Sequence, residues 1–136
     1  SNRDFAKAEQ HYRNVMRIQP ENPLALNNVA WLMANAKKPG SVQLAEKANQ
    51  LLPNRPVIMD TLALALAAEG KVPQAVETMK KALALESNNP ALRLNLAKLL
   101  IQSGDKAGAK TELTTLSELG NKFPRQGEVA ELLKTL

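Results

Sequence analysis

The stretch PVIMDTLALALAAEGKVPQAVETMKKALALESNN, residues 56–89, decides the fold of this chain. Its first half has apolar residues at the i, i+3, i+4, i+7 spacing of an amphipathic helix, and this pattern ends at a glycine. Those residues are Met59, Leu62, Ala63 and Leu66. A second stripe of the same period follows and ends at Ser-Asn-Asn; its members are Ala75, Val76, Met79, Ala82 and Leu83. The stretch therefore predicts two helices joined by a short turn.

The same pattern recurs on both sides of this stretch. Pro23, Pro56 and Pro90 open successive units, which divide the chain into repeats at 23–55, 56–89 and 90–122. Proline is tolerated there because a first-turn N–H has no partner within the helix. Residues 4–22 match the second helix of a further, truncated repeat, and residues 125–136 predict a final helix that caps the array.

Two polar residues predict where second helices begin. Ser41 follows the Pro-Gly breaker at residues 39–40 and is placed as the N-cap of a helix that runs to Leu51 or Leu52. Asp105 is placed to cap the second helix of the last unit. A side-chain oxygen at such a position accepts a hydrogen bond from a first-turn N–H that has no partner within the helix.

The pattern resembles the tetratricopeptide repeat family over nearly the whole chain. In the middle unit, Leu62 and Ala63 occupy the family's Leu-Gly positions and Leu66 an aromatic position. The second-helix positions of the family are taken by Ala75, Met79 and Ala82. Ser87 departs from the pattern, since the family usually has proline there. The resemblance implies an all-α, right-handed superhelix of antiparallel helix pairs, an α-solenoid that forms a single domain.

Composition excludes several classes of function. The net charge of +5 is scattered along the chain, without the basic stripe and stacking aromatics that nucleic-acid binding requires, so we expect no nucleic-acid partner. No apolar run approaches the roughly 20 residues of a transmembrane helix. The chain has no cysteine, which rules out disulfides and is compatible with a reducing or an oxidising compartment.

The sequence offers no set of residues for catalysis. His11 is the sole histidine and has no second ligand at i+3 or i+4, so it cannot form a metal site by itself. Gly104 and Gly108 lack the preceding strand and the Lys-Ser/Thr ending of a phosphate-binding loop. We therefore expect no enzyme activity, no metal and no cofactor.

The predicted function is binding of a protein or peptide partner. In tetratricopeptide arrays the first helix of each pair lines the concave side, so the resemblance implies a groove formed by the side chains that point away from the second helix. In repeat order the candidate groove residues are Asn27, Asn28, Trp31 and Asn35, then Asp60, Thr61, Leu64 and Ala68, then Leu94, Asn95, Lys98 and Gln102. Rigid aromatic side chains with a polar N–H are common interface anchors.

Two questions stay open at this level. Trp31 could be a groove anchor, or it could pack against the preceding helix. The residues Asn28, Thr61 and Asn95 could hydrogen-bond between repeats or to a bound backbone. An acidic C-terminal peptide, which some tetratricopeptide domains bind, is not expected here, because Asp60 and Thr61 stand where a carboxylate needs an asparagine or a cation.

A narrower resemblance concerns the segments LNNVAWLMA (residues 26–34) and MDTLALALAAEG (residues 59–70), with a Lys-Phe-Pro turn at residues 122–124. These look like the C-terminal part of bacterial tetratricopeptide lipoproteins of the PEP-CTERM and exosortase system. The resemblance implies a scaffold in the periplasm or at the outer membrane, linked to exopolysaccharide production and protein sorting. A cytoplasmic location stays open.

The two ends of the chain lead to further expectations. Ser1 and Asn2 look like a cloning remnant, and the array begins with half a helix pair. We expect further repeats before Ser1, or self-association through this N-terminal half-repeat. Alternatives to peptide binding are therefore a structural spacer or self-association module, and an accessory subunit that regulates an envelope enzyme.

Overall fold

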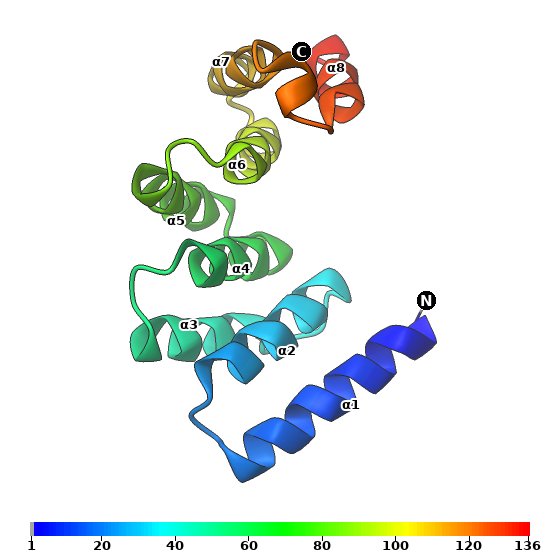
Figure 1. Cartoon of the computed structure of the whole chain (residues 1–136), viewed down its shortest axis with the longest axis vertical. Coiled ribbons are helices and arrows are strands. Elements are labelled where there is room, and N and C mark those ends of the chain that lie inside the picture. The colour runs from blue at the N-terminus through cyan, green and yellow to red at the C-terminus, as the bar shows by residue number, and fades with distance from the viewer. Residues whose placement is uncertain (1) are drawn as a thin grey trace.

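The computed structural model describes residues 2–136, all of whose regular elements are helical (Figure 1). Ser1, interpreted above as part of a cloning remnant, lies outside the described residues. The elements are α1 (Asn2–Ile18), α2 (Pro23–Asn35), α3 (Ser41–Leu51), α4 (Pro56–Ala68), α5 (Val72–Leu85), α6 (Pro90–Ser103), α7 (Lys106–Ser117), a short 3₁₀ turn η1 (Gly120–Lys122) and α8 (Gln126–Lys134). The prediction of an all-α superhelix is confirmed.

The helices stack in chain order along the long axis of the molecule, from α1 at one end to α8 at the other (Figure 1). Each pair α2/α3, α4/α5 and α6/α7 packs face to face, and the second helix of one pair packs on the first helix of the next. At the ends, α1 packs on α2 and α8 packs on α7. Each unit therefore contacts mainly its neighbours, as in a solenoid.

Local sequence signals explain where the first helices begin. The side chains of Asn22 and Asn89 cap α2 and α6, because each Oδ1 accepts hydrogen bonds from two first-turn N–H groups. A proline in the first turn follows each cap and gives up no hydrogen bond there. Asp105 caps α7 by accepting a hydrogen bond from the Gly108 N–H at 2.8 Å, as its position predicts.

The prediction that Ser41 caps α3 is wrong. Gly40 is the residue before the first helical turn, and its φ of 96° lies in the left-handed region that favours glycine. Ser41 is already inside the helix, and its buried hydroxyl has no hydrogen-bond partner among the described residues. The cap position is thus one residue earlier than predicted, and the cap residue gives no side-chain hydrogen bond, although the Val42 N–H in the first turn donates to Oε2 of Glu69.

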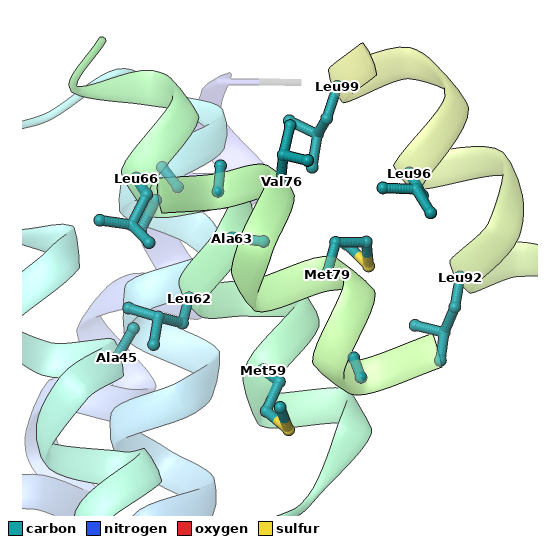
Figure 2. Close-up of a cluster of buried hydrophobic side chains, with 14 of the residues drawn as sticks. Ala45, Met59, Leu62, Ala63, Leu66, Val76, Met79, Leu92, Leu96 and Leu99 are labelled. Atoms are coloured by element: carbon teal, nitrogen blue, oxygen red, sulfur yellow. The ribbon is translucent and has the colours of Figure 1, made fainter. Parts of the chain in front are cut away.

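The core runs continuously through the middle of the stack. In α4 and α5 every residue of the two predicted apolar stripes is buried, which agrees with the predicted register. Figure 2 shows Leu62 of α4 next to Ala45 of α3, and Ala63 of α4 on the side of Val76 and Met79 of α5. Leucines of α6 lie beyond these α5 side chains. Ala63 and Ala75 are fully buried within this cluster, so small side chains fill the places where the two helices come close.

A separate apolar cluster closes the C-terminal end. Val129 of α8 is buried together with Leu113 and Leu116 of α7 and with Phe123 of the intervening turn. Leu132, Leu133 and Leu136 pack against the same cluster while keeping part of their surface exposed. The final helix therefore covers the apolar face that the last helix pair would otherwise expose.

Candidate functional site

The first helices of the three pairs are not evenly packed. Helices α2 and α4 lie in direct contact, whereas α4 and α6 do not pack closely on each other. Between α4 and α6 the surface forms a concave pocket of about 460 Å³. This volume falls in the range of roughly 300 to 1,000 Å³ that is usual for ligand clefts. We therefore compare the candidate groove residues with the residues that line this pocket.

The pocket brings seven of the predicted groove residues together. They are Trp31 and Asn35 of α2, Asp60 and Leu64 of α4, and Asn95, Lys98 and Gln102 of α6. Three repeats thus contribute side chains to one surface, although the residues lie far apart in the sequence. Their role in binding stays a prediction.

Asp60 and Asn95 join the two sides of the pocket. The Asn95 Nδ2 group donates a 2.9 Å hydrogen bond to Oδ1 of Asp60, which answers the open question for Asn95 in favour of a contact between repeats. Burial raises the pKa of the Asp60 carboxyl above its ordinary value, because removal from water disfavours the charged form, and the Asn95 hydrogen bond partly opposes this. The pocket between α4 and α6 therefore contains a half-buried carboxylate that accepts a hydrogen bond from the Asn95 amide.

A group of three charges stands at the C-terminal side of the pocket. Glu128 of α8 forms ion pairs with Lys98 of α6 and with Arg125, whose Nη2 lies 2.8 Å from Oε2 of Glu128. The hydrogen bond from Lys98 is the main cause that lowers the pKa of the Glu128 carboxyl. The two basic side chains of the pocket are thus already paired with an acid from the chain itself.

Trp31 packs on the preceding helix and also lines the pocket, and its role as a binding anchor stays a prediction. Its ring stacks on Phe5 of α1 with a centroid distance of 6.3 Å and an interplanar angle of 29°. The side chain is nevertheless 45% exposed and lines the pocket. Asn35 donates a 2.8 Å hydrogen bond to the Trp31 carbonyl, which ties these two pocket residues to one turn of α2.

Three predicted groove residues lie elsewhere, and these predictions are wrong. Asn27 is only 7% exposed and Thr61 only 3%, because α2 and α4 pack on each other and on α3. The Thr61 hydroxyl donates to the Val57 carbonyl of its own helix. Leu94 is fully buried in the C-terminal cluster, since α7 and the turn before α8 cover that side of α6.

Two further residues of the predicted set do not reach the pocket. Asn28 is half-buried on α2, and Ala68 is exposed at the end of α4, but neither lines the cavity. The same register position therefore lines the pocket in one repeat and is covered in another: Asn95 of α6 lines it, whereas Asn28 of α2 does not.

Four pocket residues were not predicted from the sequence. Ala67 and Leu99 belong to stripes that are typical of a core, Met79 comes from a second helix, and Arg125 precedes the capping helix. Met79 reaches the pocket because α4 and α6 stand apart above α5. No pattern in the sequence indicates that spacing, although the basic residue next to the final helix could have been considered.

The described residues contain no arrangement that indicates catalysis. Within residues 2–136 no group of three or more His, Asp or Glu side chains is placed to hold a metal ion. His11 is exposed on α1, where its ring meets the edge of Tyr12. In the same part of the chain, none of the helices combines the length and the apolar character that a bilayer crossing demands.

Solved structures with the same architecture come from several bacteria. MamA (residue 41 to the end) from Desulfovibrio magneticus RS-1 matches with a TM-score of 0.78 at 18% identity, over 88% of this chain and 68% of that chain. TTC0263, a thermophilic tetratricopeptide protein of Thermus thermophilus, matches with 0.78 at 18% identity, over 93% and 71%. The Yersinia enterocolitica type III secretion chaperone SycD, in complex with a peptide of the translocator YopD, matches with 0.70 at 18% identity, over 81% and 88%.

At these identities the structural matches show the fold alone. No curated protein matches the sequence. The family model described as tetratricopeptide repeat matches residues 66–133, which is half of the chain. The matched segment runs from the end of α4 into α8 and includes much of the pocket. Its sequence match and the helix-pair architecture agree, and the chain belongs to the tetratricopeptide repeat family.

Proposed function

We propose that this chain is a protein-interaction scaffold that binds a peptide or a helix of a partner protein in the pocket between α4 and α6. The observation that carries the proposal is the convergence of side chains from three repeats on one cavity of about 460 Å³. The role is recognition by a preformed surface, without a chemical step. A protein of the same fold, SycD, has been solved with a partner peptide, which supports this class of function.

The lining has the mixed character of a recognition surface. Leu64, Ala67 and Leu99 offer apolar contact area, while Asn35 and Gln102 offer exposed amide groups. Amide side chains can hydrogen-bond to the backbone of an extended segment or to polar side chains of a helix. Apolar area with a few placed polar groups is the usual composition of a specific binding cleft.

A pair of matched substitutions tests the proposal. Leu64→Lys places a charge on the pocket wall, and Leu85→Lys makes the same change at a half-exposed leucine of α5 that does not line the pocket. Capture experiments with the wild type and both variants should identify a partner that is retained by Leu85→Lys and lost by Leu64→Lys. Circular dichroism verifies that both variants keep their helical content. Equal capture by both variants would remove the pocket from the binding surface.

We further infer that the partner belongs to a bacterial envelope system for exopolysaccharide production or protein sorting. Support comes from the motif likeness at residues 26–34, 59–70 and 122–124 to PEP-CTERM and exosortase-system lipoproteins. This inference places the chain in the periplasm or at the outer membrane. Running the same capture on separate cytoplasmic, periplasmic and membrane fractions tests it: a pocket-dependent partner found in the cytoplasmic fraction alone would contradict it.

Self-association is a second candidate function, and the surface around α1 favours it. Ile18 is 76% exposed and Leu24 60% exposed, beside a shallow hollow formed by the α1–α2 turn and Leu52. Two exposed apolar side chains, one on each side of the α1–α2 turn, suit a contact with a second copy. Light scattering should then report a concentration-dependent dimer that Ile18→Asp abolishes. A monomer at all concentrations would contradict this candidate.

A further inference from the structure

The basic and acidic residues of the pocket differ in how their charges are satisfied. Lys98 and Arg125 are both paired with Glu128 of the capping helix, so each basic side chain of the pocket already has an acidic partner. Asp60 is the acidic residue of the pocket lining, and its one hydrogen-bond partner among the described residues is the uncharged amide of Asn95. The pocket therefore contains a carboxylate without a cation.

The Asp60 carboxylate is partly removed from water and has no cationic partner among the described residues. Asp60 is half-buried, and burial disfavours its ionised form. Removing a carboxylate from water costs free energy unless a cation or further hydrogen bonds compensate. Asn95 donates one hydrogen bond to Oδ1 of Asp60, and Oδ2 of Asp60 accepts no hydrogen bond from the described residues. An incoming cationic group would thus relieve an existing cost.

The same cavity offers an aromatic ring. The indole of Trp31 lines the pocket while Phe5 stacks on it from α1, which fixes the orientation of the ring. Among aromatic side chains indole attracts cations most strongly. Leu64 and Ala67 add apolar surface on which the methylene stem of a long basic side chain can lie.

We propose that the pocket recognises an arginine side chain of the partner segment, with the guanidinium bound by Asp60 and Trp31 together. This inference rests on the proposed function and names the chemistry of its partner. Arginine fits better than lysine because its planar guanidinium can stack on an aromatic ring, bond a carboxylate through two N–H groups and leave water at lower cost. A lysine ammonium is compact and more strongly hydrated.

The test is a selection from a random library of short displayed peptides. Binding to the wild type is selected, and peptides that also bind Leu64→Lys are discarded, so that the remaining peptides depend on the pocket. These should be enriched in arginine. Each is then synthesised with its arginine intact or replaced by citrulline, which has nearly the same shape without the charge, and the dissociation constants are measured by calorimetry.

Asp60→Asn is the variant that isolates the charge, because an asparagine oxygen can still accept the hydrogen bond from Asn95. We expect this variant and the citrulline peptides each to bind on the order of tenfold to a hundredfold more weakly. The matched control Glu46→Gln removes an exposed carboxylate on α3, outside the pocket, and should bind as the wild type does.

The outcomes separate this inference from the proposed function. Pocket-dependent peptides without arginine, or peptides whose affinity is unchanged in Asp60→Asn, would overturn the arginine assignment and leave the scaffold function in place. A selection that yields no pocket-dependent peptide would overturn both. Equal affinity of arginine and citrulline peptides would likewise show that the charge has no part in recognition.

Discussion

The junction between α2 and α4 is closed, whereas the junction between α4 and α6 is open. At the closed junction Leu26 of α2 and Ile58 of α4 belong to one buried cluster, and Thr61 is buried. At the open junction a hydrogen bond between Asp60 and Asn95 spans a solvent-accessible pocket. The same helix, α4, thus uses one side for stability and the other for a candidate binding surface.

The side chains on the two sides explain part of this difference. Ala30, Ala34 and Ala65 are buried in the core on the α2 and α4 helices, and small side chains allow helix axes to come close. On α6 the buried residues Leu92, Leu96 and Leu99 join the cluster that contains Val76 and Met79 of α5 (Figure 2). Helix α6 therefore rests on α5, and its distance from α4 follows from that packing.

The largest expected effect is on stability at the closed junction. Ile58→Ala removes a side chain that is 1% exposed and should lower the free energy of unfolding by about 2 to 5 kcal/mol through the cavity that it leaves. Leu64→Ala is the matched truncation on the open side of the same helix and should cost clearly less. Urea unfolding of both variants gives the comparison. Equal losses of unfolding free energy would show that the two sides of α4 contribute equally to stability and would contradict the comparison.

The second effect concerns the helix pair that both junctions share. Ala63 is fully buried where α4 meets α5, so Ala63→Leu should cost about 1 to 3 kcal/mol through overpacking. Ala68→Leu adds the same atoms at an exposed position of α4 and should stay within about 0.5 kcal/mol of the wild type. A melting temperature that Ala63→Leu leaves unchanged would refute the repeat register.

A pH experiment sharpens the comparison at the open junction. Because burial raises the pKa of Asp60 above its ordinary 3.8, the folded state holds this proton more tightly than the unfolded state. Its contribution to stability is present below the ordinary pKa and is lost as the pH rises through the raised value. Asp60→Asn should therefore be more stable than the wild type at neutral pH, with the difference vanishing at a pH of about 3.

Glu9 and Glu128 should change the stability of the fold with pH in the direction opposite to Asp60. Hydrogen bonds and charges from lysine and arginine lower the pKa of both carboxyls below the ordinary 4.5, so their contribution is lost as the pH falls through the lowered values. Urea unfolding of the wild type and of Asp60→Asn across the acid pH range separates the contribution of Asp60 from that of the two glutamates. An Asp60→Asn variant that is less stable at neutral pH would contradict the assignment of Asp60 as an uncompensated charge.

The smallest effect is expected at the capping helix. Glu128 pairs with Lys98 and Arg125, but the carboxylate side chain is 36% exposed and therefore screened by solvent and salt. Glu128→Gln should destabilise by less than about 1 kcal/mol, and high salt should reduce the difference further. Thermal melts at low and high salt measure this. A large loss that is insensitive to salt would mean that the ion pairs are structural elements of the fold.

Sequence periodicity was sufficient for the fold. The i, i+3, i+4, i+7 stripes identified Leu62, Met79 and Leu83 as core, because burial on a helix repeats with the helical period. The prolines marked the starts of the first helices, and Asp105 caps α7 as predicted, whereas the Asn22 and Asn89 caps were not predicted. These features depend on neighbouring residues, which a single sequence contains in full.

The candidate site was only partly predictable, since it depends on how far helices stand apart. Trp31, Leu64 and Lys98 were placed on the pocket side by register, whereas Asn27 and Thr61 at adjacent register positions are buried by the closed junction. Periodicity gives the face of one helix but not the distance to the next. The pairing of Lys98 with Glu128 likewise depends on the path of the chain through the turn before α8.

The most direct test of the central claim is a nuclear magnetic resonance titration of the isotope-labelled chain with the tightest pocket-dependent peptide from the selection. If the open junction is the binding surface, the largest shift changes will occur at the amides of Leu64, Asn95 and Leu99 and at the Trp31 indole. The amides of α3 and α7 should hardly change. Shifts confined to α3, α5 and α7, with the pocket signals unmoved, would contradict the account.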